Sequence, residues 1–194
     1  MSEFGSMSGE GYGRNWRDIA EEMEHPTGVG LPAKTLADRL CLAEQPQDSI
    51  DAVLDEAAIR FHHCILFRVK DNVATVWGHR GWDDRTRALD RFAVSPVSGN
   101  PLELLTIYPA FHGRMPIEPA YVPFFGQLGL GYPAEASLTP IEVNGRLVGI
   151  LYGDCGEHLR LPTSEKQDLE LAARLSYGFA LVLIKSKIRA VGDG

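Results

Sequence analysis

The pair Asn144-Gly145 constrains the fold more than any other feature of this sequence. Asparagine and glycine tolerate positive φ at both central positions of a two-residue turn, and such a turn joins two antiparallel strands. The flanking segments 135–143 and 146–154 are rich in β-branched and apolar residues, which favours strands. The sequence therefore predicts a β-hairpin at 135–154 and, with it, an antiparallel sheet.

A two-residue turn also predicts which residues of this hairpin share a face of the sheet. One face is expected to carry Ser137, Thr139, Ile141, Val148, Ile150 and Tyr152. The other is expected to carry Leu138, Pro140, Leu147, Gly149 and Leu151.

A second hairpin is predicted where Asp71-Asn72 separates the apolar runs 64–70 and 73–79. With a regular two-residue turn, Trp77 and His79 would share a face with Cys64. Both faces of this hairpin carry large apolar groups, so both are expected to be covered.

Helical periodicity marks three further segments. Apolar residues recur at helical spacing over 36–41 and again over 50–61. Ser164 and Gln167 could form a capping box that opens a final helix of about 24 residues. Between the hairpins, the signals are weaker and predict a short strand at 91–95, a helix near 102–108 and a loop rich in glycine, proline and aromatic residues.

Composition limits the class of protein. The chain has 194 residues, 44% of them hydrophobic and 23% charged, which is typical of one globular domain. Its formal net charge of -7 makes nucleic acid an unfavourable partner. No apolar run has the 18 or so residues of a membrane helix, so no membrane partner is expected. Three widely spaced cysteines suit a reducing compartment, and we expect the chain to be cytoplasmic.

We divide the chain into three parts. Residues 1–30 are expected to be vector-derived residues followed by a flexible or partly helical arm, because they combine glycine and charge with few branched apolar residues. Residues 31–190 are expected to form the folded domain, and 191–194 a disordered tail.

The order of helix, hairpin, strand, irregular crossover, Asn-Gly hairpin and long helix resembles that of GAF domains. The residues that carry the resemblance are 65–77 and the closing hairpin 139–154, with its proline, its turn and its Gly-x-Leu-Tyr-x-Asp ending. The chain is most similar to GAF-type modules at the C-terminal end of multidomain bacterial regulatory proteins. The resemblance implies an α+β fold: a central antiparallel sheet with helices on one face, a loop-rich crossover on the other, and a long C-terminal helix.

It further implies a non-enzymatic regulatory role in bacterial signal transduction. The chain would act by homodimerisation, or by docking to a protein partner or to other domains of a longer chain, through its terminal helices. Two alternatives stay open. One is a sensor that binds an unidentified small molecule, and the other is a free methionine sulfoxide reductase, a GAF-fold enzyme that uses two cysteines.

Two sets of candidate residues follow. The polar and aromatic groups suited to a ligand pocket are Trp77, His79, Ser137, Thr139 and Tyr152. The apolar stripe of the final helix suggests a dimer or partner interface at Leu175, Phe179, Val182 and Leu183, since such a stripe usually contacts another helix.

No catalytic residue, cofactor or metal is predicted. His62, His63, His112 and the pair Cys155 and His158 lack the convergent spacing of a zinc site. Cys41, Cys64 and Cys155 are expected on a helix, at the start of a strand and just after a strand, which does not favour the meeting of two sulfurs that a reductase requires.

Overall fold

The computed structural model describes residues 35–82, 89 and 91–192. Its helices are α2 (Leu36–Leu42), α3 (Pro46–Ala58), α4 (Val122–Gln127) and α5 (Glu165–Gly192), with 3-10 turns η2 (Pro101–Thr106) and η3 (Pro119–Tyr121). Its strands are β1 (His63–Lys70), β2 (Val73–Arg80), β3 (Ala93–Val94), β4 (Phe111–Arg114), β5 (Glu135–Val143) and β6 (Arg146–Asp154). The strands form one antiparallel sheet in the order β3-β2-β1-β6-β5-β4. The expected α+β class is confirmed.

Both predicted hairpins are present with the predicted turns. Asp71 and Asn72 have φ of 51° and 60°, and Asn144 and Gly145 have φ of 53° and 70°. Positive φ at both central positions is the signature of the type I′ turn, whose twist matches that of the strands it joins.

The predicted face assignment is wrong for half of each hairpin, because each contains a β-bulge. In β2 the register shifts between the pairs Leu66–Gly78 and Phe67–Val76, and Trp77 is the extra residue. In β6 it shifts between Ile141–Gly149 and Glu142–Leu147, and Val148 is the extra residue. One extra residue inverts every assignment beyond it, so His79, Ile150 and Tyr152 lie on the face opposite to the predicted one, as do Gly149 and Leu151.

A glycine follows the extra residue in both bulges. A Cβ on Gly78 would lie 2.7 Å from Leu54 Cδ1, and one on Gly149 would lie 2.8 Å from the carbonyl oxygen of Phe67. The two residues of each bulge point toward the same, helix-covered face, which has room for only one side chain. Glycine inside a strand is a recognised sign of a bulge.

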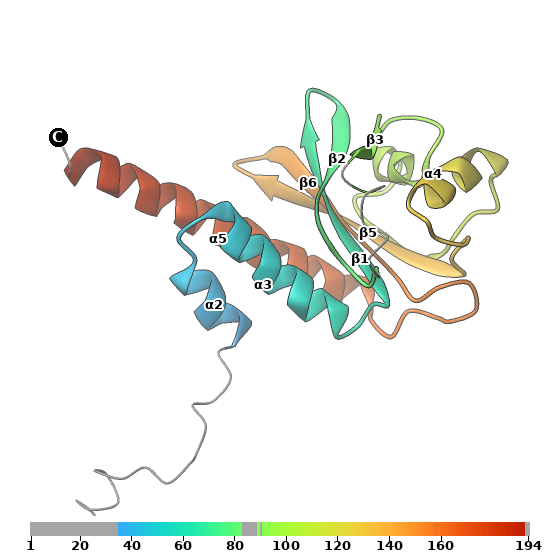
Figure 1. Cartoon of the computed structure of the whole chain (residues 1–194), viewed down its shortest axis with the longest axis horizontal. Helices are drawn as coiled ribbons and strands as arrows, with labels where there is room; N and C mark the ends of the chain where they lie inside the picture. The colour runs from blue at the N-terminus through green and yellow to red at the C-terminus, as the bar shows by residue number, and fades with distance from the viewer. Residues whose placement is uncertain (1–34, 83–88, 90, 193–194) are drawn as a thin grey trace, which may run out of the picture. The chain divides into compact units, whose positions relative to one another are not determined.

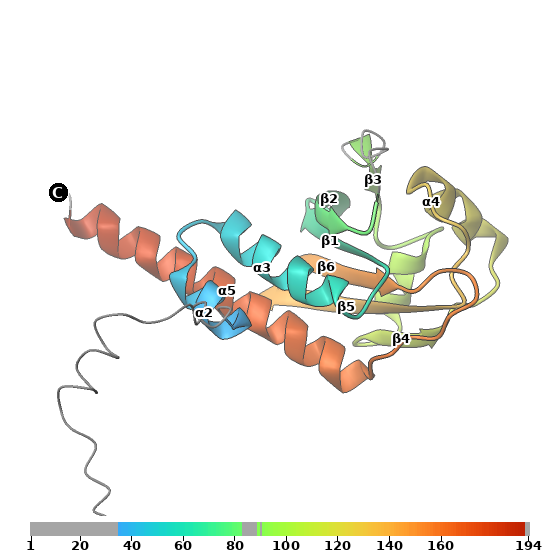
Figure 2. The same cartoon turned by 60° about the horizontal axis from the view of Figure 1, so that its bottom comes forward.

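Helices cover one face of the sheet, and the crossover between β2 and β5 covers the other. Figures 1 and 2 show α3 and α5 side by side on the helical face, with α4 on the opposite side. The core of the helical face includes Leu54 and Ile50 from α3, Leu175 from α5 and Leu66 from β1. The core of the crossover face combines aliphatic residues with several aromatic ones, among them Phe67, Phe92, Phe124, Phe125 and Tyr152.

The long final helix begins as predicted and ends later. Gln167 Oε1 accepts a hydrogen bond from the Ser164 backbone N–H at 2.9 Å, which is the return bond of a capping box. α5 has 28 residues and reaches Gly192, so it continues into the segment expected to be a tail. The expected arm at 1–30 and residues 193–194 lie outside the described residues.

The weakly marked middle segment differs most from expectation. The predicted helix near 102–108 is the 3-10 turn η2, and the strand at 91–95 is reduced to β3. β4 and α4 were not predicted; proline, glycine and aromatic residues conceal their periodicity. β4 pairs with β5 and forms one edge of the sheet.

Candidate functional site

The five predicted pocket residues lie on two different faces of the sheet. His79 and Tyr152 point toward the crossover, with Ile65 and Leu138 as their respective pairing partners. Trp77, Ser137 and Thr139 point toward the helices. Trp77 stacks on Phe179 at a centroid distance of 5.2 Å. The structure therefore does not bring the five residues together.

The crossover face around Tyr152 is densely packed. Phe67 contacts Phe92 and Phe124 at centroid distances of 5.6 and 6.1 Å, and Phe125 contacts Phe124 at 5.3 Å. Phe125 also contacts Tyr152 at 6.5 Å. These rings belong to the buried core between the sheet and the crossover.

Asp154 is a buried carboxylate at the end of β6, 1% exposed. It accepts hydrogen bonds from the Tyr152 hydroxyl at 2.6 Å and from the Gly156 backbone N–H at 2.7 Å. His63 Nδ1 lies 3.0 Å from Oδ1 of Asp154. Burial, together with the neighbouring Asp154, raises the pKa of Tyr152 well above its usual value, so the hydroxyl stays protonated and donates.

A second buried carboxylate, Asp168 in the first turn of α5, is 2% exposed. Its Oδ2 accepts a hydrogen bond from Ser137 Oγ at 2.6 Å and lies 2.9 Å from His112 Nδ1. Thr139 Oγ1 lies 3.5 Å from Ser137 Oγ. We call Asp168, His112 and Ser137 the Asp168 cluster. The serine and histidine both contact the carboxylate, and no serine–histidine contact of the kind that activates a nucleophile is formed among these residues.

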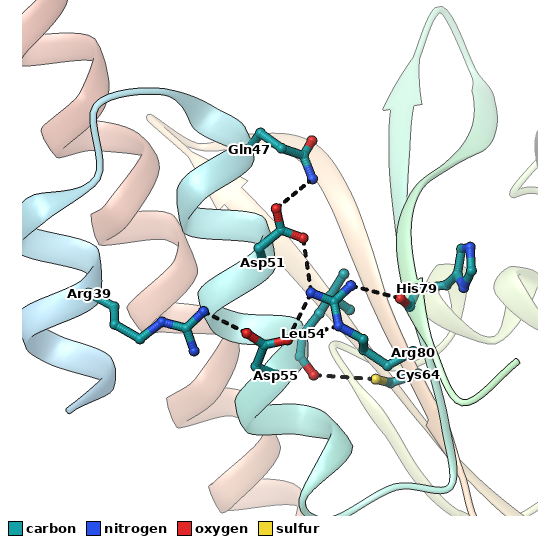
Figure 3. A network of polar contacts seen from close by, with 8 residues as sticks. All are labelled: Arg39, Gln47, Asp51, Leu54, Asp55, Cys64, His79 and Arg80. Carbon is teal, nitrogen blue, oxygen red and sulfur yellow. Dashed lines mark hydrogen bonds and ion pairs between the residues drawn. The ribbon is translucent and has the colours of Figure 1, made fainter. Parts of the chain in front are cut away.

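A third polar network joins α2, α3 and β2 on the helical side (Figure 3). Arg80 donates to Asp55 Oδ1 at 2.8 Å and to Asp51 Oδ1 at 3.0 Å, and Arg39 donates to Asp55 Oδ2 at 2.6 Å. Burial acts to raise the pKa of Asp55, but the hydrogen bonds from Arg39 and Arg80 outweigh it, so the pKa lies below its usual value. A shallow hollow of about 330 Å³ lies beside this network, lined by Arg39, Leu42, Ala43, Asp48 and Asp51.

The predicted interface residues of α5 are mostly core residues. Leu175, Phe179 and Val182 are buried against the rest of this chain, whereas Leu183 is 47% exposed. Exposed apolar residues follow a different line of the helix: Tyr177, Leu181, Ile184 and Ile188, exposed by 73, 37, 54 and 66%. We call these four residues the α5 stripe.

The three cysteines are all free thiols. Cys41 is exposed on α2, and burial raises the pKa of Cys64 to about 12 and that of Cys155 above its usual value. Cys64 Sγ contacts the carbonyl oxygen of Leu54, and Cys155 Sγ that of Arg60. A raised pKa leaves little thiolate at neutral pH, and the thiolate is the nucleophile.

Within the described ranges, no group of three or more histidine, cysteine, aspartate or glutamate residues is arranged to hold a metal ion. Nor does any helix in that part of the chain combine the length and apolarity needed to cross a membrane.

Sequence reasoning missed the residues that form these networks. Asp154 and Asp168 were not singled out, because their partners lie far away in sequence: 91 positions separate His63 from Asp154, and 56 separate His112 from Asp168. The local signal was an acidic residue in the first turn of a long helix, a position that the helix dipole favours for a negative charge, and Glu165 shares that turn with Asp168.

No protein-family model matches the chain, and no curated protein matches it by sequence. Solved structures are similar in fold. A GAF domain of a phosphoenolpyruvate-protein phosphotransferase from Coxiella burnetii superposes with a TM-score of 0.63 at 19% identity, over 78% of this chain and 92% of that one. The phycocyanobilin-bound GAF domain of a cyanobacterial phytochrome gives 0.60 at 13% identity, over 81% and 98%.

A free methionine-R-sulfoxide reductase from Neisseria meningitidis, solved with its substrate, gives a TM-score of 0.56 at 12% identity, over 77% of this chain and 87% of that one. The fold is thus shared by domains of different activity, and at these identities the likeness concerns the fold alone. Together with the sheet order, the crossover and the long final helix, these comparisons show that the chain has the GAF fold.

Proposed function

We propose that this chain is a non-enzymatic regulatory domain of a signalling protein and that it acts by forming a homodimer along α5. The observation that carries the proposal is the α5 stripe. Its four residues are spaced by 4, 3 and 4 positions, which is the spacing of the core positions of a coiled coil. A helix that packed only on its own domain would not need a second row of apolar side chains on its exposed side.

The stripe lies on the side of α5 opposite to its own core. At about 100° per residue, Tyr177, Leu181, Ile184 and Ile188 project within about 60° of one another, whereas Leu175, Phe179 and Val182 project from the other side and are buried. A second copy presents the same line of side chains, so two copies can bury their stripes against each other, as in a twofold interface.

Contacts at the C-terminal half of α5 support this arrangement by fixing the helix on its own domain. Lys185 Nζ donates to the carbonyl oxygens of Cys41 and Ala43 at 2.7 and 2.8 Å, and Arg189 forms an ion pair with Glu44. These bonds hold one side of α5 to the end of α2 and leave the stripe outward. Figure 1 shows these C-terminal turns extending beyond the sheet.

A small-molecule sensor is the second candidate. The phycocyanobilin-bound neighbour supports it, because that domain of similar fold binds a ligand. The aromatic packing beneath the crossover of this chain argues against it, since a ligand there would have to displace several rings. A thiol-dependent reductase is less well supported, because burial disfavours the thiolates of Cys64 and Cys155.

We also propose that the domain works in the cytoplasm as one part of a longer bacterial chain. Three free thiols are consistent with a reducing compartment.

Native mass spectrometry of the purified chain over a range of micromolar concentrations tests the proposal. We expect a species of twice the chain mass, without adducts, whose fraction rises with concentration. A monomer at every concentration would contradict the proposal. A discrete additional mass on either species would favour the sensor instead.

A further inference from the structure

The Asp168 cluster joins three elements through a single carboxylate. His112 belongs to β4, Ser137 to β5 and Asp168 to the first turn of α5. His112 and Ser137 are direct pairing partners across β4 and β5, so both side chains point to the same face of the sheet. Both reach Oδ2 of Asp168.

This carboxylate depends on those two donors. Burying a carboxylate is costly unless hydrogen bonds or a positive charge compensate for lost water. Oδ1 of Asp168 has no hydrogen-bond partner among the described residues, so compensation comes from His112 and Ser137 through Oδ2. An ionised carboxylate can only accept hydrogen bonds, so His112 Nδ1 is the donor in this contact.

Of the two strands in this cluster, β4 is held to the sheet by fewer hydrogen-bonded neighbours than β5. It is an edge strand of four residues, and among the described residues β5 is the one strand that pairs with it. It lies within the crossover between β2 and β5, and other parts of that crossover cover the face opposite to α5. The side chain of His112 is therefore a direct connection between the crossover and the start of α5.

We propose that the Asp168 cluster couples β4 to α5, so that a displacement of the crossover segment loosens the first turns of the helix. This inference rests on the proposed function, in which α5 carries the output. His112 and Ser137 act as positioning residues, because they hold Asp168 and lie outside the α5 stripe.

Hydrogen exchange measured by mass spectrometry on the full chain tests the coupling. We expect His112→Ala to raise the exchange of backbone amides at 169–173 in α5 about tenfold, as the loss of a hydrogen bond to a charged group would predict. In a chain that already carries Asp168→Asn, His112→Ala should raise the exchange of the amides at 169–173 less than twofold, because the group that His112 contacts has already been altered. Should Asp168→Asn not fold, Ser137→Ala alone removes the other hydrogen bond to Oδ2 and should also raise exchange at 169–173.

Two control variants separate coupling from general loss of stability. Arg114→Gln changes an exposed side chain of the same strand, and Val69→Ala removes packing from β1 without touching the cluster. Neither should alter exchange at 169–173. Unchanged exchange there in His112→Ala, or an equal increase in both backgrounds, would overturn the inference.

The same variants separate this inference from the proposed function. If the chain dimerises, His112→Ala should also shift the dimer dissociation constant, although His112 is not part of the α5 stripe. If the parent chain is monomeric at all concentrations, the proposed function fails. The exchange measurements then still decide whether β4 and α5 are coupled.

Discussion

Replacing Gly149 by alanine should destabilise the fold, because the bulge in β6 leaves no room for a methyl group. The new Cβ would lie 2.8 Å from the carbonyl oxygen of Phe67, 3.6 Å from Leu66 Cδ1 and 3.8 Å from Ile141 Cβ. The first distance is too short for a carbon–oxygen contact, and Phe67 lies in a central strand that cannot shift easily. Overpacking of this kind costs about 1–3 kcal/mol.

Part of this cost is offset in the unfolded chain. Alanine has fewer accessible backbone conformations than glycine, which stabilises the folded state by about 0.4–1 kcal/mol. Taking the middle of both ranges, we expect the free energy of unfolding to fall by about 1.3 kcal/mol, measured by urea denaturation followed by circular dichroism. In a chain of this size each kcal/mol corresponds to a decrease in Tm of about 2–4 °C.

Gly126 provides the matched control. It is exposed within α4, and a Cβ there would meet nothing within 4 Å. Gly126→Ala should leave stability unchanged or raise it by about 1 kcal/mol, since alanine favours helix. A Gly149→Ala chain as stable as the parent would refute the description of the bulge as a closely packed site.

Three further predictions concern the polar networks and the thiols. Tyr152→Phe removes a donor to buried Asp154 and should lower the free energy of unfolding by about 1–3 kcal/mol, measured in urea; no change would mean that the hydrogen bond is not formed. The folded-state pKa of Asp55 lies below its unfolded value, so its contribution is complete above the unfolded pKa and is lost as pH falls through the folded pKa. Asp55→Asn should therefore be less stable than the parent at pH 7, with the two stability curves converging as pH falls below the folded-state pKa of Asp55. Because the carboxylate is partly exposed, the difference at pH 7 should be less than about 1 kcal/mol. Finally, iodoacetamide at pH 8 should alkylate Cys41 in the folded chain and leave Cys64 unmodified until denaturant is added, and equal rates for both would contradict their assigned burial.

The turns of the two hairpins could be predicted because their chemistry is local. Positive φ at Asn144 and Gly145 follows from the residues themselves. Which side chains share a face of the sheet could not be predicted from the turn alone, since a bulge moves every later residue of the strand to the opposite face. Gly78 and Gly149 were visible in the sequence and would have indicated the bulges, and with them the separation of Tyr152 from Ser137.

The final helix shows a similar limit. Its apolar periodicity predicted the helix α5 correctly. The same periodicity led to Leu175, Phe179 and Val182 as interface residues, but these face the domain's own core. The exposed stripe is less apolar overall and starts with a tyrosine. Which of two apolar lines is covered depends on where the sheet, α3 and α2 lie, and that is a property of the tertiary structure.

Sedimentation velocity of two glutamate variants tests self-association through the α5 stripe most directly. Ile184 and Leu183 are neighbours on the same helix, 54 and 47% exposed, but they project about 100° apart, and Ile184 alone belongs to the stripe. We predict that the parent chain and Leu183→Glu sediment as dimers at concentrations where Ile184→Glu is monomeric. Dimerisation of Ile184→Glu with the affinity of the parent, or loss of the dimer in Leu183→Glu alone, would contradict the account.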